Sequence, residues 1–405
     1  MSVTPITGRL AAAAVLLASL GLSDAATTLP TPAGDSSGMY SLAAGADGRV
    51  YLSWIDPMPD KSHALRVSRL DGGAWSAPRT IATGSNWFVN WADHPSVTAL
   101  GDGTLVAHWL VNNPGKSGAY GYGIRIAQSK DAGETWREVF TAGLDNGSDY
   151  SGFVSLLPEG GGYRAVYLHP AAPAPMEPSG SAQQEVEHVK TLKVAHFSAD
   201  GALRSNATAD PDACSCCNTT IVETSDGPIA AYRDHRGEIR DISVVRFRNG
   251  QWTGPATVHD DGWRINACPT NGPSLAASGR HVAIAWFTAA GDVGRVRVAF
   301  SSDAGEHFSA PVAIDGGKPI GRPGAVLLDD RSVVVTWLES TGGGQGDVRL
   351  RRVWPDGRLG EVVVVSSPGA GRSTGIPQLA RTGDRLVVAW RSTRVETAIV
   401  AIPAR

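Results

Sequence analysis

The stretch HVAIAWFT, residues 281–288, decides the fold of this chain, because its pattern recurs six more times. Each copy is a short apolar run that reaches a Trp or Tyr near its end, which is typical of a buried β-strand. The other copies are VYLSWID (50–56), LVAHWLV (105–111), YRAVYLHP (163–170), PIAAYRD (228–234), SVVVTWLE (332–339) and RLVVAWRS (385–392). Their aromatic residues lie roughly 51 to 65 residues apart, at Trp54, Trp109, Tyr167, Tyr232, Trp286, Trp337 and Trp390. Seven copies at this period indicate a β-propeller.

The segments around each copy predict the rest of a repeat unit. A strand and turn precede it, as in PSVTALGDG (95–103), and two further strands follow most copies, as in ISVVRFRNGQWTGPATV (242–258). We therefore predict an all-β fold, a single β-propeller of four-stranded antiparallel blades, with seven blades favoured over six. The last copy is one strand short, and Thr27–Pro32 would supply that strand and leave no open edge. A long β-sandwich or a two-domain all-β chain is the alternative.

The N-terminus has the pattern of an export signal. Arg9 precedes an apolar run of about fourteen residues, and Ser23 and Ala25 place small residues before a cleavage site at Ala26. We therefore divide the chain into a signal peptide, residues 1–25, and a propeller, residues 26–405. The mature protein is expected to be periplasmic or secreted and to have no membrane span. A net charge of −3 argues against nucleic acid as a partner, and the oligomeric state stays open.

Two turns carry a motif that is specific for a fold. SKDAGETW (129–136) and SSDAGEHF (301–308) place an aspartate, a glycine and an aromatic residue at fixed spacing. The aspartates would accept backbone N–H bonds within the turn, the glycines tolerate positive φ, and the aromatic residue packs beneath. The motif resembles the Asp-box of the sialidase and BNR-repeat superfamily. That resemblance implies a propeller in which these turns join the third and fourth strands, away from the active face.

The catalytic motifs of sialidases are not matched. Members of that superfamily carry an early Phe/Tyr-Arg-Ile-Pro motif with the first of three carboxylate-binding arginines, and this tetrapeptide is absent here. Their acid Asp, nucleophilic Tyr and partner Glu have no matching motif either. Because a fold does not imply a function, the sequence leaves open whether the protein is an enzyme. If it is one, the resemblance implies a glycoside hydrolase.

The cysteines give the strongest indication of a functional site. Three of the chain's four cysteines, Cys214, Cys216 and Cys217, fall within four residues, and Cys268 follows one repeat later. In a propeller, the loops that enter the innermost strands reach the same face as the loops that join second and third strands. All four cysteines are therefore expected on one face near the axis, from adjacent blades.

Other polar residues are expected on the same face. Loops before innermost strands would bring Asp93, His94, Tyr150 and Arg322, and loops between second and third strands would bring Asp234, His235 and Arg240. A Pro-rich insertion would add His169, Met176 and His188. Solvated histidines and structural arginine–aspartate pairs are the alternative interpretation of these residues.

The spacing of the cysteines bears on their chemistry. An even number of cysteines in an exported chain favours disulfides, but a second bridge would have to close within Cys214–Cys217, and such small rings are strained. Thiolates that meet around one centre favour a soft metal. The Cys-x-Cys-Cys spacing is tighter than the knuckles of most zinc sites, which favours copper, with zinc as the competitor.

Three functions remain open from the sequence. The first is a binding protein with a soft-metal site, in which Cys214, Cys216 and Cys217 are core ligands and Cys268 is the fourth ligand or redox partner; a metal-donor or metal-acceptor protein would then be its partner. The second is a glycoside hydrolase of the sialidase superfamily, with acids such as Asp93 and Asp234 and arginines such as Arg233 and Arg322 on the same face. The third is a protein-interaction propeller whose cysteines form structural disulfides.

Overall fold

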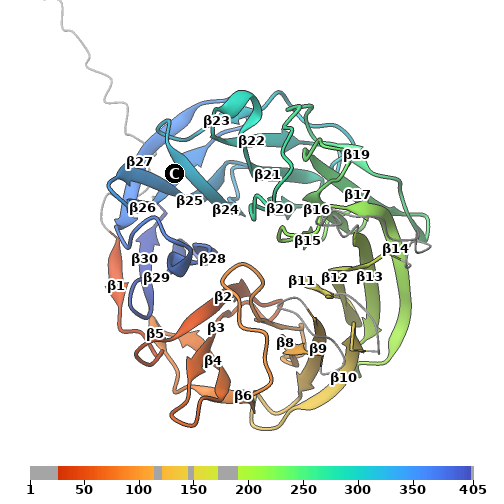
Figure 1. Ribbon diagram of the computed structural model, residues 1–405, viewed down its shortest axis with the longest axis vertical. Coiled ribbons are helices and arrows are strands. Elements are labelled where there is room, and N and C mark those ends of the chain that lie inside the picture. The colour runs from red at the N-terminus through yellow and green to blue at the C-terminus, as the bar shows by residue number, and fades with distance from the viewer. Residues whose placement is uncertain (1–25, 114–120, 145–149, 172–189, 403–405) are drawn as a thin grey trace, which may run out of the picture.

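A ring of antiparallel sheets surrounds a central axis in the computed structural model (Figure 1), which describes residues 26–113, 121–144, 150–171 and 190–402. Seven sheets are present in these ranges, each with four or five strands. The prediction of a seven-bladed all-β propeller is therefore confirmed. Within the described ranges, no helix is long and apolar enough to cross a membrane. The expected signal peptide lies outside the described residues.

The blades follow one another along the chain. Blade 1 contains β2 (Gly38–Ala44), β3 (Val50–Pro57), β4 (His63–Asp71), β5 (Ala74–Trp75) and β6 (Arg79–Gly84), and blade 2 contains β7 (Ser96–Ala99), β8 (Leu105–Asn112), β9 (Tyr122–Ser129) and β10 (Arg137–Ala142). Blade 3 contains β11 (Gly152–Glu159), β12 (Gly162–Pro170), β13 (Lys190–Ser198) and β14 (Leu203–Ala213), and blade 4 contains β15 (Thr220–Val222), β16 (Ile229–Arg233), β17 (Ile242–Arg248), β18 (Gln251–Trp252) and β19 (Ala256–Thr257).

The remaining blades complete the ring. Blade 5 contains β20 (Ser274–Ser278), β21 (His281–Thr288), β22 (Arg295–Ser301) and β23 (Val312–Ala313), and blade 6 contains β24 (Pro319–Leu327), β25 (Val333–Gly342), β26 (Gln345–Val353) and β27 (Leu359–Ser366). Blade 7 contains β28 (Gln378–Thr382), β29 (Arg385–Arg391), β30 (Val395–Ala401) and β1 (Thr27–Leu29). Two short 3-10 turns, η1 (Ala290–Asp292) and η2 (Arg372–Thr374), lie in loops.

The repeated apolar segments form the second strand of every blade. Their aromatic side chains are all buried, which identifies them as packing groups between blades. Three of the indole N–H groups also find an acceptor: Trp54 Nε1 donates to Asp56 at 2.8 Å, Trp286 Nε1 to Asp261 at 2.7 Å and Trp337 Nε1 to Glu339 at 2.6 Å. These hydrogen bonds replace the bonds to water that the three indole N–H groups lose on burial.

The ring closes by pairing its two ends. Strand β1 lies antiparallel to β30, with Thr27 opposite Ile399 and Leu29 opposite Thr397. The N-terminal segment thus supplies the outer strand of blade 7, as the sequence predicts. This pairing covers an edge that would otherwise expose unpaired backbone groups.

The two Asp-box turns have the structural role that the resemblance implies. They join β9 to β10 and β22 to β23, the third and fourth strands of blades 2 and 5. In the second turn, Asp303 accepts hydrogen bonds from Ser301 Oγ at 2.7 Å and His307 N at 3.0 Å. Gly305 has a φ of 80°, which a residue with a side chain rarely adopts.

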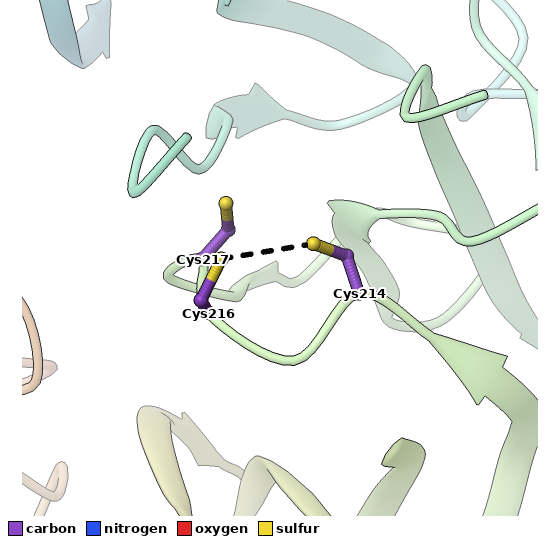
Figure 2. A group of neighbouring side chains, drawn as sticks. All are labelled: Cys214, Cys216 and Cys217. Carbon is purple, nitrogen blue, oxygen red and sulfur yellow. Dashed lines mark hydrogen bonds between the residues drawn. The ribbon is translucent and has the colours of Figure 1, made fainter. Parts of the chain in front are cut away.

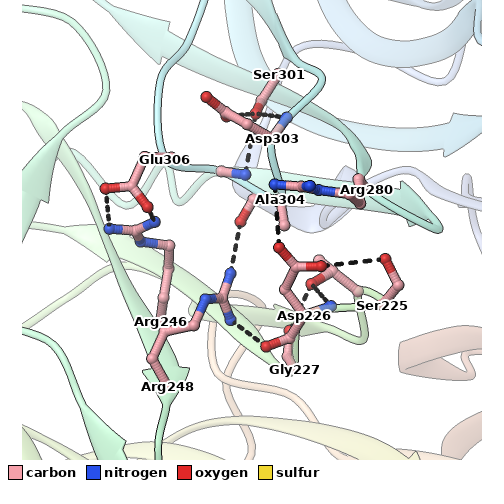
Figure 3. Close-up of polar contacts among 12 residues, drawn as sticks. Ser225, Asp226, Gly227, Arg246, Arg248, Arg280, Ser301, Asp303, Ala304 and Glu306 are labelled. Carbon is pink, nitrogen blue, oxygen red and sulfur yellow. Dashed lines mark hydrogen bonds and ion pairs between the residues drawn. The ribbon is translucent and has the colours of Figure 1, made fainter.

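A polar network ties this turn to the neighbouring blade (Figure 3). Arg246 from β17 binds Glu306, and Arg248 donates to the carbonyls of Ala304 and Asp226 at 3.1 and 2.8 Å. Arg280 completes the network with an ion pair to Asp226 at 3.2 Å. The Asp-box turn is therefore a contact between blades 4 and 5.

Candidate metal centre

Three cysteine side chains meet in the loop between β14 and β15 (Figure 2). The sulfurs of Cys214, Cys216 and Cys217, hereafter the cysteine cluster, all lie within 4.8 Å of one another. The Sγ atoms of Cys214 and Cys216 are 3.9 Å apart, and no disulfide joins the three. Their side chains are buried, with exposed fractions of 4%, 9% and 2% in chain order.

Hydrogen bonds from three blades fix this loop. Cys214 N donates to Arg233 O at 3.1 Å, which holds the start of the loop against blade 4. Tyr150 Oη donates to the carbonyl of Ser215. After the cluster, Asn218 Nδ2 donates to Ala92 O at 2.8 Å, across to the loop that enters blade 2. The positions of the sulfurs therefore depend on contacts between blades.

The fourth cysteine lies beside the cluster, as predicted. Cys268 belongs to the loop between β19 and β20 and forms a hydrogen bond with Cys216. It is exposed, in contrast to the three cluster cysteines. The sequence prediction that adjacent blades bring the four cysteines to one face near the axis agrees with this geometry.

The Cys268 loop is packed tightly onto the cluster loop. A Cβ at Gly272 would lie 2.1 Å from Asn218 O, so only glycine permits this approach. Asn271 O accepts two hydrogen bonds from Arg233, at 3.1 Å from Nε and 2.6 Å from Nη2. Arg233 thereby joins the loops of blades 4 and 5.

Arg233 also brings positive charge to the site. Its guanidinium is buried, and its partners among the described residues are the carbonyls of Asn271, Phe287 and Arg240. It also stacks 4.7 Å from the ring of Trp263. Carbonyl oxygens orient a cation without neutralising it. The charge is therefore available to a nearby anion, and it acts on Cys217.

The thiols of the cluster differ in acidity. The pKa of Cys217 lies well below its ordinary value: burial opposes this, but hydrogen bonds from Cys214 and Cys216, the charge of Arg233 and the N–H of Asn271 outweigh it. The pKa of Cys216 is raised by its hydrogen bonds to the other thiols and by burial. The pKa of Cys214 rises to about 12, because its bond with Cys217 and burial outweigh the opposing bond with Cys216. The cluster therefore holds one thiol of lowered pKa beside two thiols of raised pKa.

A second buried cation lies behind Tyr150. Lys190 is fully buried; its Nζ donates to Tyr150 O at 2.9 Å and lies 3.5 Å from the centre of the Tyr150 ring. Its backbone is paired with Ala213, the residue before Cys214. Lys190 was not among the residues expected on this face, because the side chain of a lysine in a predicted strand is expected to be exposed to solvent.

The candidate acids are held within the fold. Asp93 is buried; its Oδ1 accepts from Phe153 N at 2.8 Å and its Oδ2 from Tyr122 Oη at 2.9 Å. Burial raises the pKa of Asp93 to about 7. Asp234 accepts from Ser243 Oγ at 2.6 Å and pairs with Arg236 at 2.9 Å. Both carboxylates therefore have structural partners.

The other predicted residues are dispersed over the same face. His235 Nδ1 lies 2.6 Å from Asp212 Oδ1, and His169 Nδ1 lies 2.7 Å from Ser151 Oγ. Arg240 is buried beside its own loop, with its N–H bonded to Trp263 O at 2.8 Å. Burial lowers the pKa of His94. Met176 and His188 lie outside the described residues.

Arg322 lies within β24, at a bulge, instead of in the loop before it. Its φ of 58° is unusual for a residue with a side chain. The side chain stacks 4.2 Å from the ring of Trp91 and donates to Gly375 O at 2.7 Å. Burial lowers its pKa to about 10. It lines an axial cavity of about 360 Å³, which also borders Asn218 and Asn271.

The geometry of the cluster fits a metal ion. Metal–thiolate bonds of about 2.3 Å place sulfur ligands on one ion roughly 3.8 to 4.0 Å apart. The Cys214–Cys216 separation of 3.9 Å agrees with this spacing. Buried thiolates are soft ligands, which suit Cu(I) and Zn(II). The cysteine cluster can therefore hold a metal with little rearrangement.

Comparisons with known proteins define the class of fold. The sequence matches no family model, and it matches no curated protein sequence. Among solved structures, it is similar to a PL25 polysaccharide lyase, an ulvan lyase, with 11% identity, a TM-score of 0.56 and coverage of 93% of this chain and 96% of that one. An α-L-arabinofuranosidase, Arb93A from Fusarium graminearum, matches with 12% identity, a TM-score of 0.50 and coverage of 95% and 98%.

Sialidases are also similar to this chain. A mutant of the NanB sialidase from Streptococcus pneumoniae matches with 12% identity, a TM-score of 0.45 and coverage of 93% of this chain and 70% of that one. The protein itself is a seven-bladed β-propeller. At these identities the similarity concerns the fold alone.

Proposed function

We propose that this protein is an exported propeller that binds a soft metal ion, Cu(I), through the thiolates of Cys214, Cys216 and Cys217. The observation that carries the proposal is the cluster itself, three buried sulfurs within 4.8 Å of one another. The three thiols are free and their sulfurs converge, so a single ion could be shared among them. Cys268, which is exposed beside Cys216, is a peripheral thiol of this site.

Copper is favoured over zinc by the form of the cluster. Cu(I) accepts three sulfur ligands, whereas structural zinc sites take four in a tetrahedron. Three of the four thiols are buried together and the fourth is exposed. A compact set of three with one peripheral thiol therefore matches Cu(I) better.

The surrounding charges support an anionic complex. Three thiolates around a single Cu(I) carry a net charge of about −2. The buried guanidinium of Arg233 acts on Cys217, and its partners among the described residues are carbonyls. This arrangement lowers the cost of burying the negative complex.

The experiment is a titration of the reduced protein with Cu(I) in competition with bicinchoninate. One equivalent of Cu(I) should bind, and Cys216→Ser and Cys217→Ser should each weaken binding at least 100-fold. The same titration with Zn(II) decides between the two metals. No uptake of Cu(I) by the reduced wild-type protein would reject the proposal.

A glycoside hydrolase is less well supported by the site. Both oxygens of Asp93 accept hydrogen bonds from the fold, and Asp234 is bonded to Ser243 and Arg236. Hydrolysis of a glycoside needs a proton donor and a second carboxylate that face the sugar. The enzymes of similar structure share only the fold with this chain.

A further inference from the structure

The four cysteines differ sharply in their access to solvent. The cluster cysteines are at most 9% exposed, whereas Cys268 is exposed. A hydrogen bond links Cys268 to Cys216, the most exposed of the three. A continuous sulfur path therefore leads from solvent to the buried cluster.

The path is built into the packing of two loops. Arg233 holds Asn271 by two hydrogen bonds, and Asn271 Oδ1 accepts a third from Arg322 N at 2.5 Å. Gly272 lies against the backbone of Asn218, directly after the cluster. Thr270, which has a φ of 51°, turns the chain between Cys268 and these contacts. Cys268 is thus held beside the cluster by its own loop.

Resting on the proposed function, we infer that Cys268 is the exchange ligand of the site, which receives Cu(I) from a thiol-bearing carrier and passes it to Cys216. Exchange of a soft ion between sulfur ligands requires the incoming sulfur to reach the metal before the outgoing one leaves. A carrier that holds the ion cannot reach sulfurs buried to this degree. The exposed thiol of Cys268 can make that first contact.

The transfer involves no change of oxidation state. The Cys268 thiol loses its proton and its sulfur bonds to the Cu(I) of the carrier complex. One carrier thiolate then leaves the ion and takes up that proton. Cu(I) next bonds to Cys216, whose proton passes to the second carrier thiolate as that thiolate leaves the ion. Cys214 and Cys217 then bond to the ion through their thiolates, any remaining proton passing to water, and the Cu(I)–Cys268 bond breaks as Cys268 takes a proton back from water. The ion stays Cu(I) throughout and goes from two sulfur ligands in the carrier complex to three in the cluster.

The test separates the rate of Cu(I) uptake from the affinity. Cu(I)–glutathione is mixed with the reduced apoprotein in a stopped-flow instrument, and thiolate-to-copper absorbance is followed. Bicinchoninate competition gives the affinity of the same variants. We expect Cys268→Ser to slow uptake at least 10-fold while its affinity stays within 10-fold of wild type. Asn266→Ala, exposed on the same loop, should change neither quantity.

The contrary outcomes are distinct. If Cys268→Ser takes up Cu(I) at the wild-type rate, or if its rate falls no more than its affinity does, Cys268 is not the exchange ligand. Urea unfolding of apo Cys268→Ser should match wild type, because the exposed side chain contributes little to packing. If the wild-type protein itself takes up no Cu(I), the proposed function fails, and this inference fails with it.

Discussion

At the scale of single residues, the site depends on side chains whose environment differs from their ordinary one. Asp93 is a buried carboxyl without a described cationic partner, and Arg233 is a buried guanidinium that donates to carbonyls. Gly272 permits a backbone approach that a Cβ would prevent. Each of these features leads to a measurable consequence, either for stability or for the proposed metal site.

Asp93 should make stability depend on pH. Its pKa is raised from 3.8 to about 7 in the folded protein, so between these values the folded state holds a proton that the unfolded state has lost. Its contribution therefore falls as the pH rises from about 4 to about 7, by about 4 kcal/mol at 1.36 kcal/mol per pKa unit. The Asp93→Asn variant cannot titrate at this position. Relative to wild type, its free energy of unfolding in urea should rise between pH 4.5 and pH 8.

Comparison of the variant with wild type removes the contributions of other titrating groups. Parallel pH profiles for the two proteins would show that Asp93 titrates alike in the folded and unfolded states. Asp384→Asn serves as the matched control, because its carboxyl is 86% exposed.

Gly272 should be necessary for the approach of the two cysteine-bearing loops. A Cβ at this position would meet Asn218 O at 2.1 Å, and backbone cannot move aside cheaply. We expect Gly272→Ala to cost about 1–3 kcal/mol of unfolding free energy, as overpacked sites do, and to weaken Cu(I) binding. Gly254→Ala, where a Cβ would meet nothing within 4 Å, should leave both unchanged. Equal results for the two variants in urea unfolding and Cu(I) titration would contradict this reading of the contact.

At the scale of elements, most strands of a blade pair with strands that are their neighbours in the sequence. Other contacts form only when the blades assemble into the ring. Strands β3, β8, β12, β16, β21, β25 and β29 carry the repeated apolar segments and were predictable from them. Strand β1 is different, because its partner β30 is at the other end of the chain. This pairing and the burial of Leu29 hold its three residues in place.

Closure of the ring should therefore be sensitive to Leu29. Its side chain is 8% exposed on the outermost strand of blade 7. We expect Leu29→Ala to lower the unfolding free energy by about 2 kcal/mol, the lower end of the range for buried leucine. Thr27→Ala, on an exposed position of the same strand, is the control. A loss no larger than that of the control, measured by urea unfolding, would show that β1 contributes little to closure.

At the scale of the whole molecule, the proposed metal site depends on contacts between loops of neighbouring blades. The cluster lies between β14 of blade 3 and β15 of blade 4, and Cys268 precedes β20 of blade 5. The contacts that place these loops come from residues far apart in the sequence. Because the folded ring holds the three sulfurs close together, the ion should bind the folded state more tightly than the unfolded chain, which couples its binding to folding.

Cu(I) should consequently stabilise the folded protein. With free Cu(I) at 1,000 times its Kd, the unfolding free energy should rise by about 4 kcal/mol. In Cys216→Ser, whose binding is expected to be at least 100-fold weaker, the increase should fall to about 1.4 kcal/mol or less, with the apoprotein of each variant as the reference. Thermal or urea unfolding with buffered Cu(I) measures both. An unchanged midpoint for the loaded wild-type protein would contradict binding to the folded state.

The sequence by itself determined the repeat, and with it the number of blades, the buried aromatic residues and the closing strand. These follow from periodicity and local apolar patterning, which act through neighbours along the chain. It also placed the four cysteines on one face, because in a propeller the loops that enter the innermost strands all lie on the same face.

The tertiary structure alone decided that three sulfurs are buried within 4.8 Å of one another while Cys268 is exposed. It also decided that Asp93, Arg233 and Lys190 are buried. The physical reason is that burial and sulfur distances arise from loop packing between blades, through contacts such as Asn271 with Arg233 and Gly272 with Asn218, and no local pattern encodes these.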